Sequence, residues 1–144
     1  MPESALARKL KIKPKMRAAI TNPPEGFMQA LGDLPDGFSL GHRLEGSFDW
    51  VQIFVKSRAE LARLAPKAVE SLSPVSLLWV CFPKGSSKIQ TDLTRDKGWE
   101  VLQNLDLKFI TLVSVTEVWS AFSLRPFRPG EEHTPLPLGL LRLA

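Results

Sequence analysis

The sequence has 144 residues, enough for one domain that buries roughly two thirds of its unfolded surface. Its single cysteine, Cys81, excludes an internal disulfide, and its place in an apolar run predicts an inert buried thiol in a reducing compartment. No stretch approaches the ~18 apolar residues of a membrane span, and no signal-peptide pattern opens the sequence. We therefore expect a cytoplasmic protein that neither spans nor binds a membrane.

The formal net charge of +4 is concentrated in residues 1–17. This stretch sets six basic side chains against Glu3, which leaves a nearly neutral remainder of 13 basic and 14 acidic residues. The six are Arg8, Lys9, Lys11, Lys13, Lys15 and Arg17. Because short basic runs are more often solvated than bound to phosphates, we do not expect nucleic acid as a partner.

The first elements are short. Residues 6–10 form an amphipathic segment that Pro14 prevents from continuing as a helix, so residues 1–16 are predicted to be a basic arm with a short helix. A strand is expected at 17–20. The Pro- and Gly-containing stretch 22–26 predicts a loop, which leads into a helical turn at 27–31.

The middle of the sequence predicts a βαβ unit. After a short strand at 38–41, the aromatic and β-branched run 48–55 is typical of a central strand. Ser57 and Glu60 then have the spacing of a capping box, followed by an apolar helical stripe to Leu72. The apolar run 77–82 follows as the next strand, and the unit should be right-handed.

The last third predicts a helix and a hairpin. A loop at 84–88 leads to a helix that begins near Asp92 or Thr94, and strands follow at 109–115 and 118–124. Two intervening residues suffice only for an antiparallel hairpin. We place the domain at 17–125. The Pro- and Leu-rich tail 126–144 either docks on that domain or joins two copies as a homodimer.

Together these elements predict an α/β, Rossmann-like fold. We expect a mostly parallel sheet of about six strands with helices on both faces and a C-terminal antiparallel hairpin. This order and spacing resemble class I methyltransferases.

Stretches 78–88, 91–96 and 119–121 also resemble a group of small uncharacterised bacterial proteins that share a domain of unknown function. The resemblance covers roughly residues 6–128 and implies no established activity. The chain departs from that group's pattern at Lys11 and Lys15, where glycine is usual, and at Asp106.

The loop after the first strand bears on whether the protein could transfer methyl groups. A methyltransferase normally brings several glycines here, so that the backbone approaches S-adenosylmethionine (SAM). This chain has Pro23 and Pro24, which remove two N–H donors, and no acidic ribose ligand ends the second strand, where Glu45 is the nearest substitute. We therefore predict no evident cofactor and disfavour SAM, and keep a divergent SAM-dependent methyltransferase as an alternative.

Other catalytic chemistry has little support in the sequence. His42 and His133 are far apart and no cysteines are paired, so we predict no metal site. Ser86 and Ser87 lie in no nucleophile elbow, although a pair of Ser86 with Lys88 is conceivable. The sequence leaves open whether the protein is an enzyme.

The best ligand candidate is the loop that follows the strand at 77–82. Open α/β sheets bind ligands at their carboxyl edge, and lysines, hydroxyls and a glycine suit a phosphate or nucleotide. The leading hypothesis is binding of such a small anionic ligand, and a solvated turn is an equal alternative. Candidate ligand-binding residues are Asn22, Lys56, Lys84, Gly85, Ser86, Ser87 and Lys88.

Asp92, Arg95 and Asp96 are secondary candidates for an acid/base set, although helix capping explains the two acids more simply. A third hypothesis is a protein interaction module that uses the basic arm and the tail.

Overall fold

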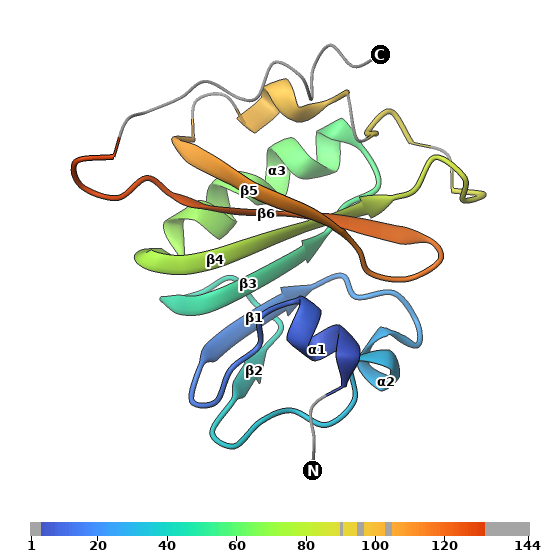
Figure 1. The fold of residues 1–144 in the computed structure, drawn as a ribbon. Helices are drawn as coiled ribbons and strands as arrows, with labels where there is room; N and C mark the ends of the chain where they lie inside the picture. Colours follow the sequence, from blue (N-terminus) through green and yellow to red (C-terminus); the bar gives the residue numbers. More distant parts are fainter. Residues whose placement is uncertain (1–3, 90, 95–96, 103–104, 132–144) are drawn as a thin grey trace.

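A computed structural model describes residues 4–89, 91–94, 97–102 and 105–131. Its centre is a six-stranded sheet with strand order β2-β1-β3-β4-β6-β5 (Figure 1). The strands are β1 (Arg17–Thr21), β2 (Ser39–Gly41), β3 (Phe48–Phe54), β4 (Leu72–Pro83), β5 (Leu107–Ser114) and β6 (Trp119–Pro126). The helices are α1 (Ala5–Lys9), α2 (Phe27–Leu31), α3 (Arg58–Glu70) and the 3-10 turn η1 (Trp99–Leu102).

The directions of the strands confirm the predicted mostly parallel sheet and its terminal hairpin. Strands β2, β1, β3 and β4 run parallel, whereas β6 pairs antiparallel with both β4 and β5. The chain leaves β1 for β2 on one side, and β3 then lies on the other side of β1. The sheet therefore has a topological switch point between β1 and β3, at which ligands bind in open α/β folds.

Helix α3 forms where its cap and apolar stripe predict it. The Ser57 hydroxyl accepts from the Glu60 N–H at 3.1 Å, and the Glu60 carboxylate accepts from the Lys56 N–H at 2.6 Å. The first bond is that of a capping box, and the second reaches the N–H one residue before the N-cap Ser57. The helix continues past Pro66 to Glu70 and buries Leu61, Leu64, Ala65 and Ala68.

Two clusters of buried side chains hold the sheet. One contains Trp99 and Phe122 with the buried side of α3, and the other contains Trp50, Trp79 and Trp119 with α1 and α2. The described residues contain three α-helices, of which α1 and α2 have only five residues each. The complete helical layers that we expected on both faces are therefore not shown.

The helix predicted to begin near Asp92 or Thr94 is wrong for the described part of that segment. Residues 91–94 are irregular, and η1 is a single 3-10 turn. Gly98 has φ +103°, which a helix excludes, and the Trp99 indole N–H donates to the Thr94 carbonyl at 2.7 Å. This indole bond takes the place of a helical turn.

The N-terminal segment folds back onto the sheet (Figure 1). The indole N–H groups of Trp50 and Trp79 both donate to the Leu10 carbonyl at 2.9 Å. Lys11, Lys15 and Asp106 have φ of 62°, 65° and 51°, the left-handed region that favours glycine. The departures from the bacterial group's pattern thus fall at positions with a glycine-like backbone.

The division into 1–16, 17–125 and 126–144 stays a prediction. Most of the predicted tail, with His133, lies outside the described residues. No helix in the described part of the chain is long and apolar enough to cross a membrane.

Candidate functional site

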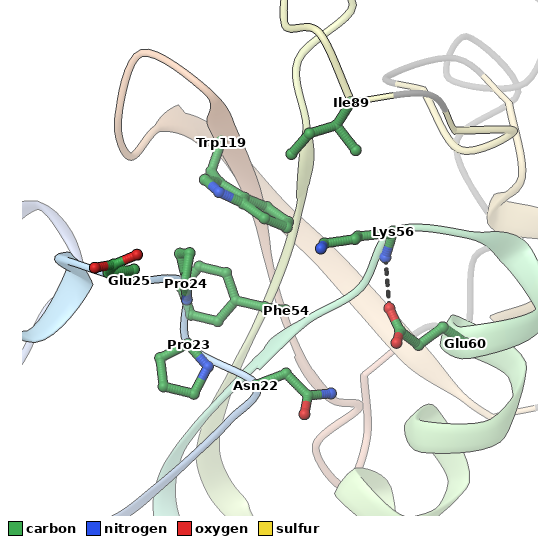
Figure 2. Close-up of a pocket in the computed structure, with 9 residues that line it drawn as sticks. All are labelled: Asn22, Pro23, Pro24, Glu25, Phe54, Lys56, Glu60, Ile89 and Trp119. Atoms are coloured by element: carbon green, nitrogen blue, oxygen red, sulfur yellow. Dashed lines mark hydrogen bonds between the residues drawn. The ribbon is translucent and has the colours of Figure 1, made fainter.

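A pocket of about 430 Å³ opens at the carboxyl edge of the parallel strands (Figure 2). Its walls come from the loop after β1, the end of β3 with the residues that follow it, the first turn of α3, the segment after β4 and the start of β6. The pocket falls within the ~300–1,000 Å³ range of small-molecule sites. The lining residues are Asn22, Pro23, Pro24, Glu25, Phe54, Lys56, Glu60, Ile89 and Trp119.

The sheet register brings these segments together. Thr21 at the end of β1 pairs with Ile53 of β3, so Asn22 and Lys56 follow neighbouring strands at the same edge. Trp119 arrives from the other direction, because it begins β6 and pairs antiparallel with Pro83 at the end of β4. The pocket therefore lies at the switch point, where a ligand is expected on topological grounds.

The charged groups of the pocket differ in their partners. Glu60 is held by the Lys56 N–H, whereas the Lys56 ammonium and the Glu25 carboxylate have no partner among the described residues. Figure 2 shows the Lys56 side chain extending across the pocket toward Trp119, with Glu25 beyond the two prolines. A free cation and a free anion thus lie at the rim of one cavity.

The remaining walls are apolar. The rings of Phe54 and Trp119 are buried and meet edge to face with their centroids 5.2 Å apart, and Ile89 adds a third apolar side chain to the lining. Pro23 and Pro24 have no N–H to offer a ligand. Polar contacts in this pocket must therefore come mainly from side chains.

A second hollow of about 290 Å³ adjoins this pocket and shares Pro24, Glu25 and Trp119 with it. Its other walls come from α2 and from the turn between β5 and β6. It offers a mainly apolar surface beside the charged rim. The residues that it adds are Gly26, Phe27, Ala30, Thr116 and Val118.

The structure brings together only two of the predicted ligand-binding residues, Asn22 and Lys56. The Lys84 ammonium donates to the Ser114 hydroxyl at 2.6 Å, on the hairpin. The Ser87 N–H donates to the Lys84 carbonyl at 2.9 Å and closes a turn. Gly85, Ser86, Ser87 and Lys88 are not among the residues that line the pocket.

Of the secondary candidates Asp92, Arg95 and Asp96, the structure describes Asp92. An Asp92 carboxylate oxygen accepts from the Arg58 N–H at 2.8 Å, and the Asp92 carbonyl accepts from the Arg58 guanidinium at 3.2 Å. Asp92 thus binds the first residue of α3, which precedes it in the chain. Arg95 and Asp96 lie outside the described residues.

Sequence reasoning missed several lining residues: Glu25, Phe54, Glu60, Ile89 and Trp119. The sequence could have placed Trp119 at the pocket, because the second strand of the predicted hairpin must begin at the carboxyl edge if it pairs with the strand at 77–82. It could not have placed Glu25 there, since the position of Glu25 depends on how the proline loop turns. The described residues hold no group of three or more His, Cys, Asp or Glu that could bind a metal ion.

No protein family and no curated protein matches the chain by sequence. Solved structures do match it in fold. The ribosomal protein L11 methylase from Lactobacillus delbrueckii subsp. bulgaricus has a TM-score of 0.52 at 13% identity, over 85% of this chain and 75% of that one. The mitomycin 7-O-methyltransferase MmcR has 0.60 at 10%, over 85% and 53%. DhpI in complex with SAH has 0.58 at 10%, over 85% and 82%.

The chain has a class I methyltransferase-like fold. At these identities the likeness shows the fold alone, and the resemblance to the bacterial domain of unknown function stays a prediction.

The prediction of no evident cofactor, with SAM disfavoured, is wrong. The finding that overturns it is that structural neighbours hold this type of cofactor, as in the DhpI complex with S-adenosylhomocysteine (SAH). The prediction rested on the missing glycines and on the N–H groups lost at Pro23 and Pro24. Those losses remove backbone contacts, but a cavity with free charged side chains is still present at the same loop.

Proposed function

We propose that this protein binds SAM or its product SAH in the carboxyl-edge pocket, as a divergent methyltransferase. The observation that carries the proposal is the position of the pocket at the switch point between β1 and β3. Its support is the methyltransferase-like fold, in which that edge is the expected ligand site.

The chemistry of the lining fits the two ends of such a ligand. The Lys56 ammonium suits the ligand's carboxylate, and the Glu25 carboxylate suits its α-ammonium group. The apolar lining that Trp119 and Ile89 contribute suits a flat base. Side-chain charge then takes the place of the backbone N–H groups that a glycine loop would supply.

The ribose contact differs from the usual arrangement. Strand β2 ends at Gly41, which pairs with Ala19, two residues before β1 ends. No residue of β2 lines the pocket, so an acid at its end could not reach the ribose there. The polar group left for the ribose hydroxyls is the Asn22 amide.

When bound, SAM supplies a methyl group carried on a sulfonium. The chain's own task is to hold the acceptor beside it and to exclude water, and the apolar hollow next to the pocket suits that task. Glu60 is occupied by its capping bond to the Lys56 N–H. Because Glu25 is assigned to the ligand's α-ammonium group, neither carboxylate of the lining is left to take a proton from an acceptor.

Isothermal titration calorimetry with SAH tests the binding step. We expect saturable one-to-one binding that Lys56→Ala weakens by at least about tenfold, since a hydrogen bond to a charged group contributes about 1.5–3 kcal/mol. Lys97→Ala is the matched control, because Lys97 is also exposed but lies outside the pocket. No heat at millimolar SAH, or equal weakening by both variants, would overturn the proposal.

A small anionic ligand, phosphate- or nucleotide-like, is the second candidate function. The free Lys56 ammonium favours it, whereas Lys84 is engaged by Ser114. Thermal shifts with inorganic phosphate, AMP and SAH separate the two. Stabilisation by phosphate or AMP without stabilisation by SAH would favour this candidate.

A further inference from the structure

A row of unpaired basic side chains runs from α1 to the start of β1. None of its members has an ion-pair partner within the described ranges, and all are exposed. We call these side chains the basic row: Arg8, Lys9, Lys11, Lys13 and Lys15.

The backbone that carries the basic row is anchored by buried residues and hydrogen bonds. Ala7, Leu10 and Ile12 are buried between its members, and two tryptophan indoles bind the Leu10 carbonyl at 2.9 Å. Because buried residues alternate with Lys11 and Lys13, both lysines project outward from an anchored backbone. A merely solvated arm would need no such anchoring, whereas a preorganised cationic surface loses less entropy when it binds an anion.

One end of the row lies at the hollow beside the pocket. The Lys9 ammonium donates to the Ser114 carbonyl of the hairpin at 2.9 Å, and the Ser4 hydroxyl donates to the Leu31 carbonyl of α2 at 2.6 Å. Helix α2 and the turn of that hairpin are the elements that line the hollow. In Figure 1, α1 lies beside α2, and the chain runs from α1 to the start of β1.

We propose that the basic row binds the phosphates of a single-stranded nucleic acid, one base of which enters the apolar hollow. Cations that follow one another closely along the chain suit a phosphate backbone, and Phe27, Val118 and Trp119 give the hollow an apolar lining against which an unstacked base can lie. A duplex would keep its bases out of the hollow.

The base-accepting step rests on the proposed function, because it brings a nucleobase beside the SAM pocket as methyl acceptor. The phosphate contacts are independent of it. We therefore expect the row to bind nucleic acid in the absence of SAM or SAH.

Fluorescence anisotropy with labelled single-stranded RNA, single-stranded DNA and duplex DNA tests the row. We expect the single strands to bind best. Lys11→Glu with Lys13→Glu should weaken binding at least tenfold and lower the log–log salt slope by about 1.4, at ~0.7 per lost phosphate contact. Lys11→Gln with Lys13→Gln should weaken it less, and circular dichroism confirms that both variants fold.

The matched control is Lys67→Glu with Lys97→Glu, which changes the net charge equally but lies at α3 and before η1. It should bind single strands nearly as the parent does. Equal loss in both charge reversals, no single-strand binding at low salt, or tighter binding of polyglutamate or anionic lipid vesicles would overturn the proposal.

Titrations with SAH separate the two proposals. The Lys11 and Lys13 variants should bind SAH as the parent does, because neither residue lines the pocket. Weakened SAH binding in Lys56→Ala with intact strand binding supports both. Absence of SAH binding in the parent, with strand binding retained, removes the proposed function and leaves the row.

Discussion

Hydroxyl groups at the two ends of the parallel strands differ in whether they are hydrogen-bonded. At the amino end, the Ser76 hydroxyl donates to the Phe48 carbonyl at 2.6 Å and accepts from the Ser73 N–H at 2.8 Å. At the carboxyl end, the hydroxyls of Thr21 and Ser87 are buried with no hydrogen-bond partner among the described residues. Buried polar groups are normally paired, so the carboxyl end gives up stability that the amino end retains.

Two groups of charged side chains differ in the same way. Beyond β6, near the amino end, the Glu131 carboxylate accepts from the Arg125 guanidinium at 2.6 and 2.8 Å, from the Lys108 ammonium at 2.9 Å and from the Arg128 N–H at 2.7 Å. At the carboxyl end, Lys56 and Glu25 have no such partners in the described part of the chain. The polar groups around Ser76 and Glu131 at the amino end are thus paired, whereas Lys56 and Glu25 at the carboxyl end are not, within the described residues.

The largest effect on stability is expected at the amino end. Ser76→Ala removes the hydroxyl that joins the Phe48 carbonyl to the Ser73 N–H, and with it one buried and one part-buried hydrogen bond. The free energy of unfolding should fall by about 1–3 kcal/mol. Urea denaturation measures it, with SAH binding unchanged. A change below about 0.5 kcal/mol would show that the network contributes little.

Loss of a hydroxyl at the carboxyl end should have the opposite sign. Thr21→Val replaces a buried, unpaired hydroxyl with a methyl group of similar size, and valine suits a strand. We expect the free energy of unfolding to rise by up to about 1 kcal/mol in the same urea assay. A loss comparable to that of Ser76→Ala would remove the contrast between the two ends.

Glu131 should make stability depend on pH. Its hydrogen bonds to Arg125, to the Arg128 N–H and to Lys108 lower its pKa well below the usual 4.5. The folded state thus holds the ionised carboxylate more strongly, so the stabilisation is present above pH 4.5 and is lost as the pH falls below it.

Glu131→Gln should therefore lower the thermal unfolding midpoint at pH 7, and the difference from the parent should shrink steadily below pH 4.5. Scanning calorimetry over this range measures it. A difference that is constant with pH would mean that Glu131 acts through packing rather than through charge.

Local signals predicted much of the fold. The apolar run 48–55 became β3, and the Ser57 hydroxyl caps α3 at Glu60 as the spacing predicted. The short connection after 109–115 gave the antiparallel hairpin, although residues 115–118 separate the two strands rather than the predicted two residues. Each depends on neighbours in sequence. The extension of β4 back to Leu72 was missed, because its support is the Ser76 bond to Phe48, which no local pattern shows, and Pro74 argued against a strand.

The site was predictable only where it follows from strand ends. Asn22 and Lys56 were found because each follows a predicted parallel strand, although ligand binding by them stays a prediction. Lys84 also follows such a strand, but its side chain turns to Ser114. Trp119 reaches the pocket because β6 pairs antiparallel with β4, which is a long-range contact. Glu25 reaches it through a loop whose path the sequence does not specify.

Cys81, in the middle of the sheet, reports the smallest expected effect in the comparison of the two strand ends. Burial raises the pKa of its thiol to about 12, although Gln52 donates to the sulfur at 3.1 Å. Because the thiolate is the reactive form, an aromatic disulfide reagent at pH 8 should not label the native protein and should label it in urea.

Labelling in moderate urea then reports the opening of the sheet. SAH bound at the carboxyl end should slow the labelling of Cys81, since a ligand that binds the folded state stabilises it. The same SAH should slow labelling less in Lys56→Ala at equal concentration. Rapid labelling without urea would show that the sheet opens locally at β4, and an equal effect of SAH on both proteins would place the ligand away from Lys56.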